Sequence, residues 1–262
     1  MISDFIFDGR TLSSFGYVLV FENSEDSPNV SNMEMQSIKG ARNDRSYGTG
    51  YQYGENYTGT YLIIKNYCED PNHPDMSDED VSTITRWLCR KHYKWFRFID
   101  PDNVDDIWYK VYFRVQKDMI GDSVVGLRLT ITTNAPYGFS KEINHTYTDK
   151  NFEVFTNSDE EGYVYPDLKI KLKEGGDFRL KNVTENRTTA LNNCIAGEII
   201  TLSGYDTQQI TSTNEAHDYI HEFNYKFPRL WNRYAITKNE FECNLNAEIE
   251  FTYREVRKVG MK

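Results

Sequence analysis

Residues 134–140 read NAPYGFS and lie near the middle of the 262-residue chain. The Pro-Tyr-Gly run within them predicts a turn, because proline restricts the backbone angle φ and glycine adopts conformations that other residues avoid. On both sides of this junction, short segments alternate between apolar and polar residues, which is typical of β-strands. The sequence therefore predicts a mainly β protein of two domains, residues 1–136 and residues 137–262.

One helix is predicted before the junction, at about residues 77–93. Ser77 can cap its first turn, and the acidic residues that follow suit the positive end of the helix dipole. Val81, Ile84 and Leu88 recur at helical spacing and form one apolar face. Basic residues occupy the last expected turn. We expect the apolar face of this helix to pack on a β-sheet.

Strands are predicted on both sides of this helix and throughout the second half. Before the junction they are residues 5–7, 15–21, 33–39, 57–67, 95–99, 106–115 and 124–133. After the junction they are residues 152–156, 164–173, 178–182, 188–190, 198–202, 209–211, 222–227, 233–236 and 247–254. No helix is expected in the second half. Many short strands separated by turn signals favour a β-sandwich or a jelly roll there.

Residues 40–54 read GARNDRSYGTGYQYG and are rich in glycine, tyrosine and arginine. They lie between two predicted strands, so we expect a long hairpin or extended arm with this stretch as its tip. Arginine and tyrosine are common in interface hot spots. The candidate subunit-interface residues are Arg42, Asp44, Arg45, Tyr47, Tyr51 and Tyr53. A mobile surface loop is the alternative interpretation of this stretch.

Composition narrows the class of protein. The chain is 39% hydrophobic and 15% aromatic, which is typical of a folded protein rather than a disordered one. Its net charge of −10 argues against specific nucleic-acid binding and against docking on anionic lipid. No stretch approaches the roughly 20 apolar residues of a membrane span, so we expect no membrane insertion. The first residues do not read as a secretory signal, and the four cysteines are expected to be free, buried thiols.

No motif predicts catalysis. His217 and His221 have the i, i+4 spacing of a metal-binding pair on a helix, but their surroundings read as a loop that enters a strand. We therefore expect structural or surface histidines. The chain contains no H-E-x-x-H, C-x-x-C, G-x-S-x-G or P-loop motif. We expect no enzyme activity and no catalytic residue, metal ligand or cofactor-binding residue, and no cofactor.

Several short motifs, taken in order, resemble the distal tail protein (Dit) family of long-tailed bacteriophages. They cover nearly the whole chain. They are Phe5-Ile6-Phe7-Asp8-Gly9, Ser14-Phe15-Gly16, Ala135-Pro136-Tyr137-Gly138, Phe227-Pro228-Arg229-Leu230 and Arg257-Lys258-Val259-Gly260. The Gly-rich hairpin and the single helix also come in the order that this family shows.

The resemblance implies a virion protein that is assembled in the host cytoplasm and located at the tail tip or baseplate. It implies an N-terminal, sandwich-like ring domain and a C-terminal galectin-like β-sandwich. Six copies would form a ring that joins the tail tube protein to the tail-associated hub protein and lines the DNA channel without gripping the DNA. Receptor-binding proteins are further expected partners.

Two other functions stay open at the level of the sequence. A β-sandwich with exposed aromatic residues is also typical of a carbohydrate-binding module that adheres to a host surface. Galectins, however, hold sugars with H-x-N-P-R and W-G-x-E-x-R segments. Here Trp231 is followed by Asn232-Arg233, and neither segment is present. A hydrolase that uses paired carboxylates is the other alternative, although no spacing points to it.

Overall fold

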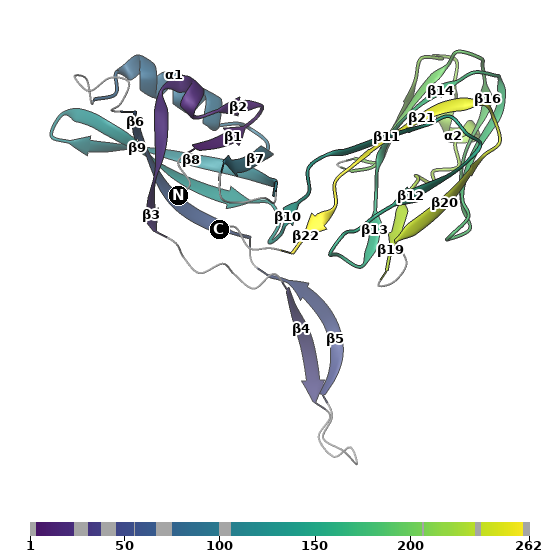
Figure 1. The fold of residues 1–262 in the computed structure, drawn as a ribbon, viewed down its shortest axis with the longest axis horizontal. Helices are drawn as coiled ribbons and strands as arrows, with labels where there is room; N and C mark the ends of the chain where they lie inside the picture. The colour runs from purple at the N-terminus through teal and green to yellow at the C-terminus, as the bar shows by residue number, and fades with distance from the viewer. Residues whose placement is uncertain are drawn as a thin grey trace. The chain divides into compact units, whose positions relative to one another are not determined.

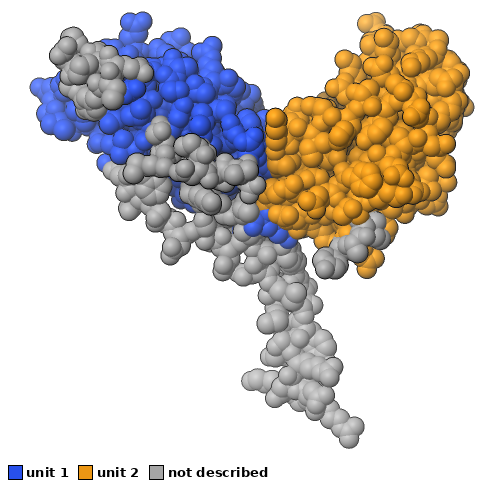
Figure 2. Space-filling view, in the orientation of Figure 1, with its two compact units in different colours: residues 1–139, 258–262 blue, residues 140–257 orange. Residues whose placement is uncertain are grey.

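The structure is a computed structural model that describes residues 4–23, 31–37, 46–54, 56–66, 75–99, 106–205, 207–233 and 237–258. For residues 21–23, 31–37 and 46–53 only the backbone is described. The chain divides into two compact units, Met1–Phe139 with Lys258–Lys262, and Ser140–Arg257 (Figure 2). The predicted mainly β architecture is confirmed (Figure 1).

A seven-stranded antiparallel sheet forms the framework of the first unit (Figure 1). In spatial order its strands are β2 (Arg10–Thr11), β1 (Asp4–Phe7), β7 (Lys94–Ile99), β8 (Tyr109–Ile120), β9 (Ser123–Thr133), β6 (Thr58–Lys65) and β3 (Tyr17–Asn23). Shorter elements of this unit are the 3-10 turn Ser13–Phe15 and β10 (Gly138–Phe139). In the part of the first unit that the structure describes, helix α1 packs on this one main sheet, where a sandwich-like domain was expected.

An aromatic cluster lies at the centre of the first unit. Phe5, Phe7, Phe96 and Phe113 come from three adjacent strands and are fully buried. The ring of Phe113 meets that of Phe7 edge to face at 4.9 Å. Trp87 of the helix stacks on Phe5 at 5.6 Å and donates its indole N–H to the carbonyl oxygen of Phe7 at 3.1 Å. The helix is thus attached to the sheet by ring packing and by a buried hydrogen bond.

The helix α1 (Asp78–Leu88) begins where the sequence predicts. Ser77 Oγ accepts the backbone N–H of Asp80 at 3.1 Å, and the Asp80 carboxylate accepts the N–H of Ser77 at 2.9 Å. This reciprocal capping box satisfies two N–H groups that a helix start leaves without partners. The helix ends at Leu88, earlier than predicted, because the backbone of Cys89 is no longer helical. Arg90 lies beyond the helix.

The arm differs from the predicted hairpin in its strand pairing. β4 (Ser31–Ser37) pairs with β5 (Ser46–Tyr53) in a separate two-stranded antiparallel sheet. Most of the stretch predicted as the tip is therefore the second strand of the hairpin. The strand predicted at residues 57–67 is instead β6, which pairs with β3 and β9. β6 joins the main sheet because its alternate residues, including Tyr61 and Ile63, are buried in the core.

The second unit is a two-sheet β-sandwich, as predicted. One sheet has the order β11 (Ile143–Tyr147), β21 (Ala247–Tyr253), β14 (Asp167–Leu172), β17 (Ile199–Ser203) and β18 (Gln209–Ser212). The other has the order β12 (Asn151–Phe155), β20 (Lys238–Cys243), β15 (Gly176–Asn182) and β16 (Arg187–Cys194). The two sheets share one apolar core, in which Phe241 and Phe251 meet at 5.3 Å. Shorter strands are β13 (Gly162–Val164), β19 (Leu230–Asn232) and β22 (Val256–Arg257).

One segment of the second unit contradicts the sequence prediction. A short helix, α2 (Tyr219–Glu222), lies where no helix was expected, and residues 222–227 do not form the predicted strand. Asn224 explains the missing strand: its side chain accepts the N–H of Ala190 and donates to the carbonyl of Thr188, in place of a regular ladder. The apolar residues Phe223 and Phe227 are buried nevertheless, so the apolar pattern of this segment marks core positions rather than a strand.

The junction predicted from the sequence ends the first unit. Trp108 and Phe139 exchange two backbone hydrogen bonds, at 2.8 and 2.7 Å. Gly138 directly precedes Phe139 and faces the side chains of Ile107 and Tyr109. A methyl group at this glycine would collide with Cγ2 of Ile107 and would stand 3.1 Å from Cε1 of Tyr109. Glycine is therefore required here for lack of space.

Replacing Gly138 by alanine is expected to destabilise the first unit by about 1–3 kcal/mol, the usual cost of overpacking. In a chain that already carries Ile107→Ala, the same substitution should cost much less, because the colliding methyl group is gone. Chemical denaturation of the four proteins of this double-mutant cycle measures the difference. Equal costs in both backgrounds would show that the clash with Ile107 is not the cause.

Candidate functional site

The predicted interface residues lie in or next to the arm. Arg42, Asp44 and Arg45 lie outside the described residues. The three tyrosines lie on β5, of which only the backbone is described. In the register of the hairpin, Tyr47 pairs with Gln36, Tyr51 with Met33 and Tyr53 with Ser31.

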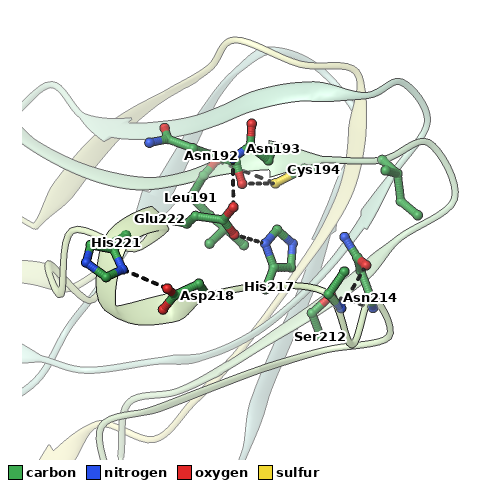
Figure 3. Close-up of polar contacts among 12 residues, drawn as sticks. Leu191, Asn192, Asn193, Cys194, Ser212, Asn214, His217, Asp218, His221 and Glu222 are labelled. Carbon is green, nitrogen blue, oxygen red and sulfur yellow. Dashed lines mark hydrogen bonds and ion pairs between the residues drawn. The ribbon is translucent and has the colours of Figure 1, made fainter.

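A buried polar cluster in the second unit is the most distinctive arrangement of ionisable groups in the described chain. His217 lies between two carboxylates. Its Nε2 is 2.7 Å from Glu198 Oε1. Its Nδ1 is 2.5 Å from Glu222 Oε2 (Figure 3). The His217 side chain is 1% exposed and that of Glu198 is fully buried. Both ring nitrogens can donate to these carboxylates at once only when the ring is an imidazolium.

The surrounding backbone and side chains hold both carboxylates in place. Ser212 Oγ donates to Glu198 Oε1 at 2.6 Å, and the backbone N–H of Ile195 donates to Glu198 Oε2 at 2.9 Å. The side-chain amide of Asn193 donates to Glu222 Oε1 at 2.7 Å. Every oxygen of the two carboxylates therefore has a hydrogen-bond partner, which offsets the cost of burying these charges.

Cys194, the last residue of β16, completes the cluster. Its thiol, the side chain of Glu198 and that of His217 each offer a ligand atom, and these atoms lie within 4.8 Å of one another. The Cys194 thiol donates a weak hydrogen bond to the carbonyl of Leu191 at 3.4 Å (Figure 3). The cluster thus combines a sulfur, an oxygen and a nitrogen donor.

The environment shifts the pKa values of these groups. Burial raises the pKa of the Cys194 thiol to about 11, and the charge of Glu198 adds to this effect. Burial alone would lower the pKa of His217. The hydrogen bonds and charges of Glu222 and Glu198 outweigh it and keep that pKa above its usual value. Burial therefore favours the protonated thiol of Cys194, and the two carboxylates raise the pKa of the His217 imidazole.

The two histidines do not form a ligand pair. His221 lies in α2, contrary to the predicted strand, with its side chain 79% exposed and its Nδ1 2.7 Å from Asp218 (Figure 3). His217 contacts other partners, as described above. Sequence reasoning missed these partners because Glu198 and Glu222 lie 19 and 5 positions from His217, and neither spacing is typical of a known motif.

The remaining residues singled out from the sequence have structural surroundings. Cys194 and Cys243 are buried free thiols, as predicted. Cys89 is a free thiol but is exposed, contrary to the prediction, and Cys68 lies outside the described residues. Trp231 is only half-exposed, and the buried side chain of Asn239 binds its backbone N–H and its carbonyl, at 2.8 and 3.0 Å. In the described ranges, no helix has the length and apolar character needed to cross a membrane.

Sequence comparison decides the family. A phage tail protein N-terminal domain matches residues 1–135, and a phage tail C-terminal domain matches residues 137–253. The chain belongs to this family of phage tail proteins. The two matches meet at residue 136, within the junction from which the two-domain organisation was predicted. No curated protein matches the phage tail protein significantly.

Solved structures identify the fold of the phage tail protein. The crystal structure of the Dit protein (gp 19.1) of phage SPP1 matches with a TM-score of 0.65 and 11% identity, over 97% of this chain and 99% of that one. A chain of the phage P2 baseplate in its activated conformation with calcium matches with a TM-score of 0.55 and 9% identity, over 97% and 98%. The corresponding strontium structure matches with a TM-score of 0.52 and 9% identity, over 96% and 98%.

These matches confirm the resemblance to distal tail proteins. The phage tail protein has a Dit-like fold along its whole length. It is a structural protein of the phage tail and hence of the virion.

Proposed function

We propose that the phage tail protein forms a homohexameric ring at the distal end of the tail, between the tail tube protein and the baseplate hub protein. The observation that carries this proposal is the end-to-end match with SPP1 Dit, a protein described as a paradigm of the hub adsorption apparatus of phages that infect Gram-positive hosts. A match over 97% of one chain and 99% of the other includes both domains, so the proposal rests on the complete fold rather than on one module.

The two domains receive different roles in this proposal. Residues 1–136 form the assembly domain, because they contain the helix and the arm. Residues 137–262 form a galectin-like sandwich on which receptor-binding proteins can dock. The galectin-like fold does not imply sugar binding here, because the sugar-binding segments are missing and Asn239 hydrogen-bonds the backbone of Trp231.

The arm supplies the physical argument for self-association. Among the described residues, β4 and β5 pair only with each other, in a sheet of two strands. A lone two-stranded hairpin is only marginally stable in water. Contact with a neighbouring subunit would bury its surface and satisfy its outer edges. Arg42, Asp44, Arg45, Tyr47, Tyr51 and Tyr53 would then lie at the subunit interface, where arginine and tyrosine contribute most.

The charge of the chain is consistent with a DNA channel. Six copies of a chain with a net charge of −10 give a strongly acidic ring. Proteins that bind DNA tightly neutralise its phosphates with lysine and arginine. An acidic ring therefore lets DNA pass without retaining it.

Light scattering of the purified full-length chain tests the proposal. We expect particles of six times the 30.8-kDa chain mass at rising protein concentration, and rings with a central opening in negative-stain images. A monomer that persists at the highest concentrations and shows no rings would contradict a self-assembling ring.

A further inference from the structure

We propose that Cys194, Glu198 and His217 bind a zinc ion in the second unit. The three ligand atoms are a cysteine sulfur, a carboxylate oxygen and an imidazole nitrogen, and they lie within 4.8 Å of one another. Cys194 is the last residue of β16, Glu198 directly precedes β17, and His217 lies two residues before α2. All three belong to the same sandwich. The proposal is independent of ring formation, since it concerns one domain of one chain.

The geometry needs only small adjustments to hold the ion. In zinc sites the metal lies about 2.3 Å from sulfur, about 2.0–2.1 Å from nitrogen and about 2.0–2.2 Å from oxygen. Ligand atoms around a tetrahedral ion are therefore roughly 3–4 Å apart. His217 Nε2 and Glu198 Oε1, now 2.7 Å apart in a hydrogen bond, must separate slightly, and the sulfur must approach. Rotation of the Cys194 side chain away from the carbonyl of Leu191 supplies this movement.

The neighbours of the three ligands already have the positions that metal sites require. Glu222 accepts a hydrogen bond from Nδ1 of His217 at 2.5 Å, which places the lone pair of the neutral ring on Nε2. A carboxylate behind a ligating histidine is the usual outer partner in zinc sites. Asn193 fixes Glu222, and Ser212 with the Ile195 N–H fixes Glu198. Both carboxylates are therefore oriented before any ion arrives.

The donor set favours zinc over the hard cations. Calcium and magnesium bind almost entirely through oxygen atoms, whereas zinc accepts sulfur, nitrogen and oxygen together. Binding replaces the proton on the Cys194 sulfur and the proton on Nε2 of His217, and both protons leave to solvent. Bonds from zinc to sulfur and nitrogen form in their place, and the charge on Glu198 is then neutralised by the ion.

Three protein ligands leave a fourth position, which a water molecule can fill. Glu198 and His217 are almost fully buried, so the ion would cross-link segments of the sandwich as a structural site rather than act as a catalytic centre. It would connect the end of β16, the start of β17 and the turn before α2. Hydrogen bonds of the Glu198 and His217 side chains already join these segments.

Cobalt and zinc titrations of the full-length protein, stripped of metal by a chelator, test the inference. We expect about one equivalent of zinc per chain after dialysis, and a higher Tm for the second unit with zinc but not with magnesium. Cobalt should produce the absorption bands of a tetrahedral site and a thiolate-to-cobalt charge-transfer band. Wild-type protein that is folded but retains no zinc and shows no such band would overturn the proposal and leave a metal-free ion cluster.

Matched variants locate the site. Cys194→Ser should abolish the charge-transfer band and weaken zinc binding at least tenfold, whereas Cys243→Ser, the other buried free thiol of this unit, should change neither. Glu222→Gln should weaken zinc binding by about 10–100-fold, the usual effect of losing an outer partner of a ligating histidine. Undiminished zinc binding by Cys194→Ser would mean that the ion lies elsewhere and would refute the assignment. If a variant fails to fold, the cobalt spectrum of the wild-type protein still tests the proposal through its thiolate-to-cobalt charge-transfer band.

Discussion

Removing the arm is expected to convert the ring into monomers while both units stay folded. In this variant, residues 31–53 are replaced by a short Gly-Ser linker. The main sheet tolerates the change because β3 and β6 pair directly with each other, and Asn23 at the end of β3 lies opposite Thr60 near the start of β6. The linker and the residues that flank it therefore have to connect only two strands that already pair with each other. What is lost is the hairpin that the ring model places between subunits.

Light scattering measures the loss of assembly, and circular dichroism with thermal unfolding measures the fold. We expect a monomer mass with an unchanged Tm. Substituting Tyr47, Tyr51 and Tyr53 together by serine should weaken association by roughly a hundredfold or more, because hot-spot residues contribute about 2 kcal/mol or more each. Tyr225→Ser, at an exposed tyrosine of the second unit, is the matched control and should leave the ring intact. Normal rings from the variant without the arm would show that it is only a surface loop.

Replacing Phe113 by alanine is expected to lower the free energy of unfolding of the first unit by about 3–5 kcal/mol. Its ring is fully buried and contacts those of Phe5, Phe7 and Phe96 at 5.8, 4.9 and 5.8 Å. Its loss leaves a cavity between three strands and removes three aromatic contacts. Since domains are stable by only about 5–15 kcal/mol, this single change should bring the first unit close to unfolding at room temperature.

The neighbouring residue provides the control for this prediction. Tyr112 lies next to Phe113 on β8 but faces the other side of the sheet and is 42% exposed. Tyr112→Ala should change stability by about 0.5 kcal/mol or less. Hydrogen exchange resolves the two units: protection should fall in β1, β7 and β8 of the Phe113 variant and stay unchanged in β14 and β21. An equal loss in both units, or a cost like that of Tyr112→Ala, would contradict the assigned core.

Local signals explain what could be predicted correctly. The start of α1 follows from Ser77 and Asp80, which contact each other within one turn, and its buried face follows from the spacing of apolar residues. The second half was recognisable as a sandwich because its strands are short, alternate in burial and are separated by turns. These properties depend on neighbours in sequence, so a sequence contains them directly.

Strand partners and irregular segments could not be predicted in the same way. Alternation assigns residues to faces of a strand but does not say which strand lies beside it. For this reason β6 was assigned to the arm, although it belongs to the main sheet. The segment around Phe223 and Phe227 has apolar residues at core positions, and only the fold shows that Asn224 supplies the hydrogen bonds of the missing strand.

The candidate metal site depends on tertiary structure alone. His217 was singled out together with His221, but its hydrogen-bond partners are Glu198 and Glu222, and the thiol of Cys194 lies within 4.8 Å of the Glu198 and His217 ligand atoms. Side chains this far apart in sequence meet only because β16, β17 and α2 pack at the same part of the sandwich. Their burial then sets the pKa values of the thiol and the imidazole, which no spacing in the sequence records.

The junction at residues 134–140 shows which features can be predicted from the sequence and which depend on the tertiary structure. The sequence by itself determined that the chain has two β-rich halves, because turn chemistry and alternation are local properties. The first compact unit ends at Phe139, a few residues after the predicted boundary. Only the tertiary structure decided why position 138 is glycine, since the wall formed by Ile107 and Tyr109 leaves no space for a methyl group. Contacts between residues distant in sequence likewise place β6 in the main sheet rather than in the arm, and they form the buried cluster.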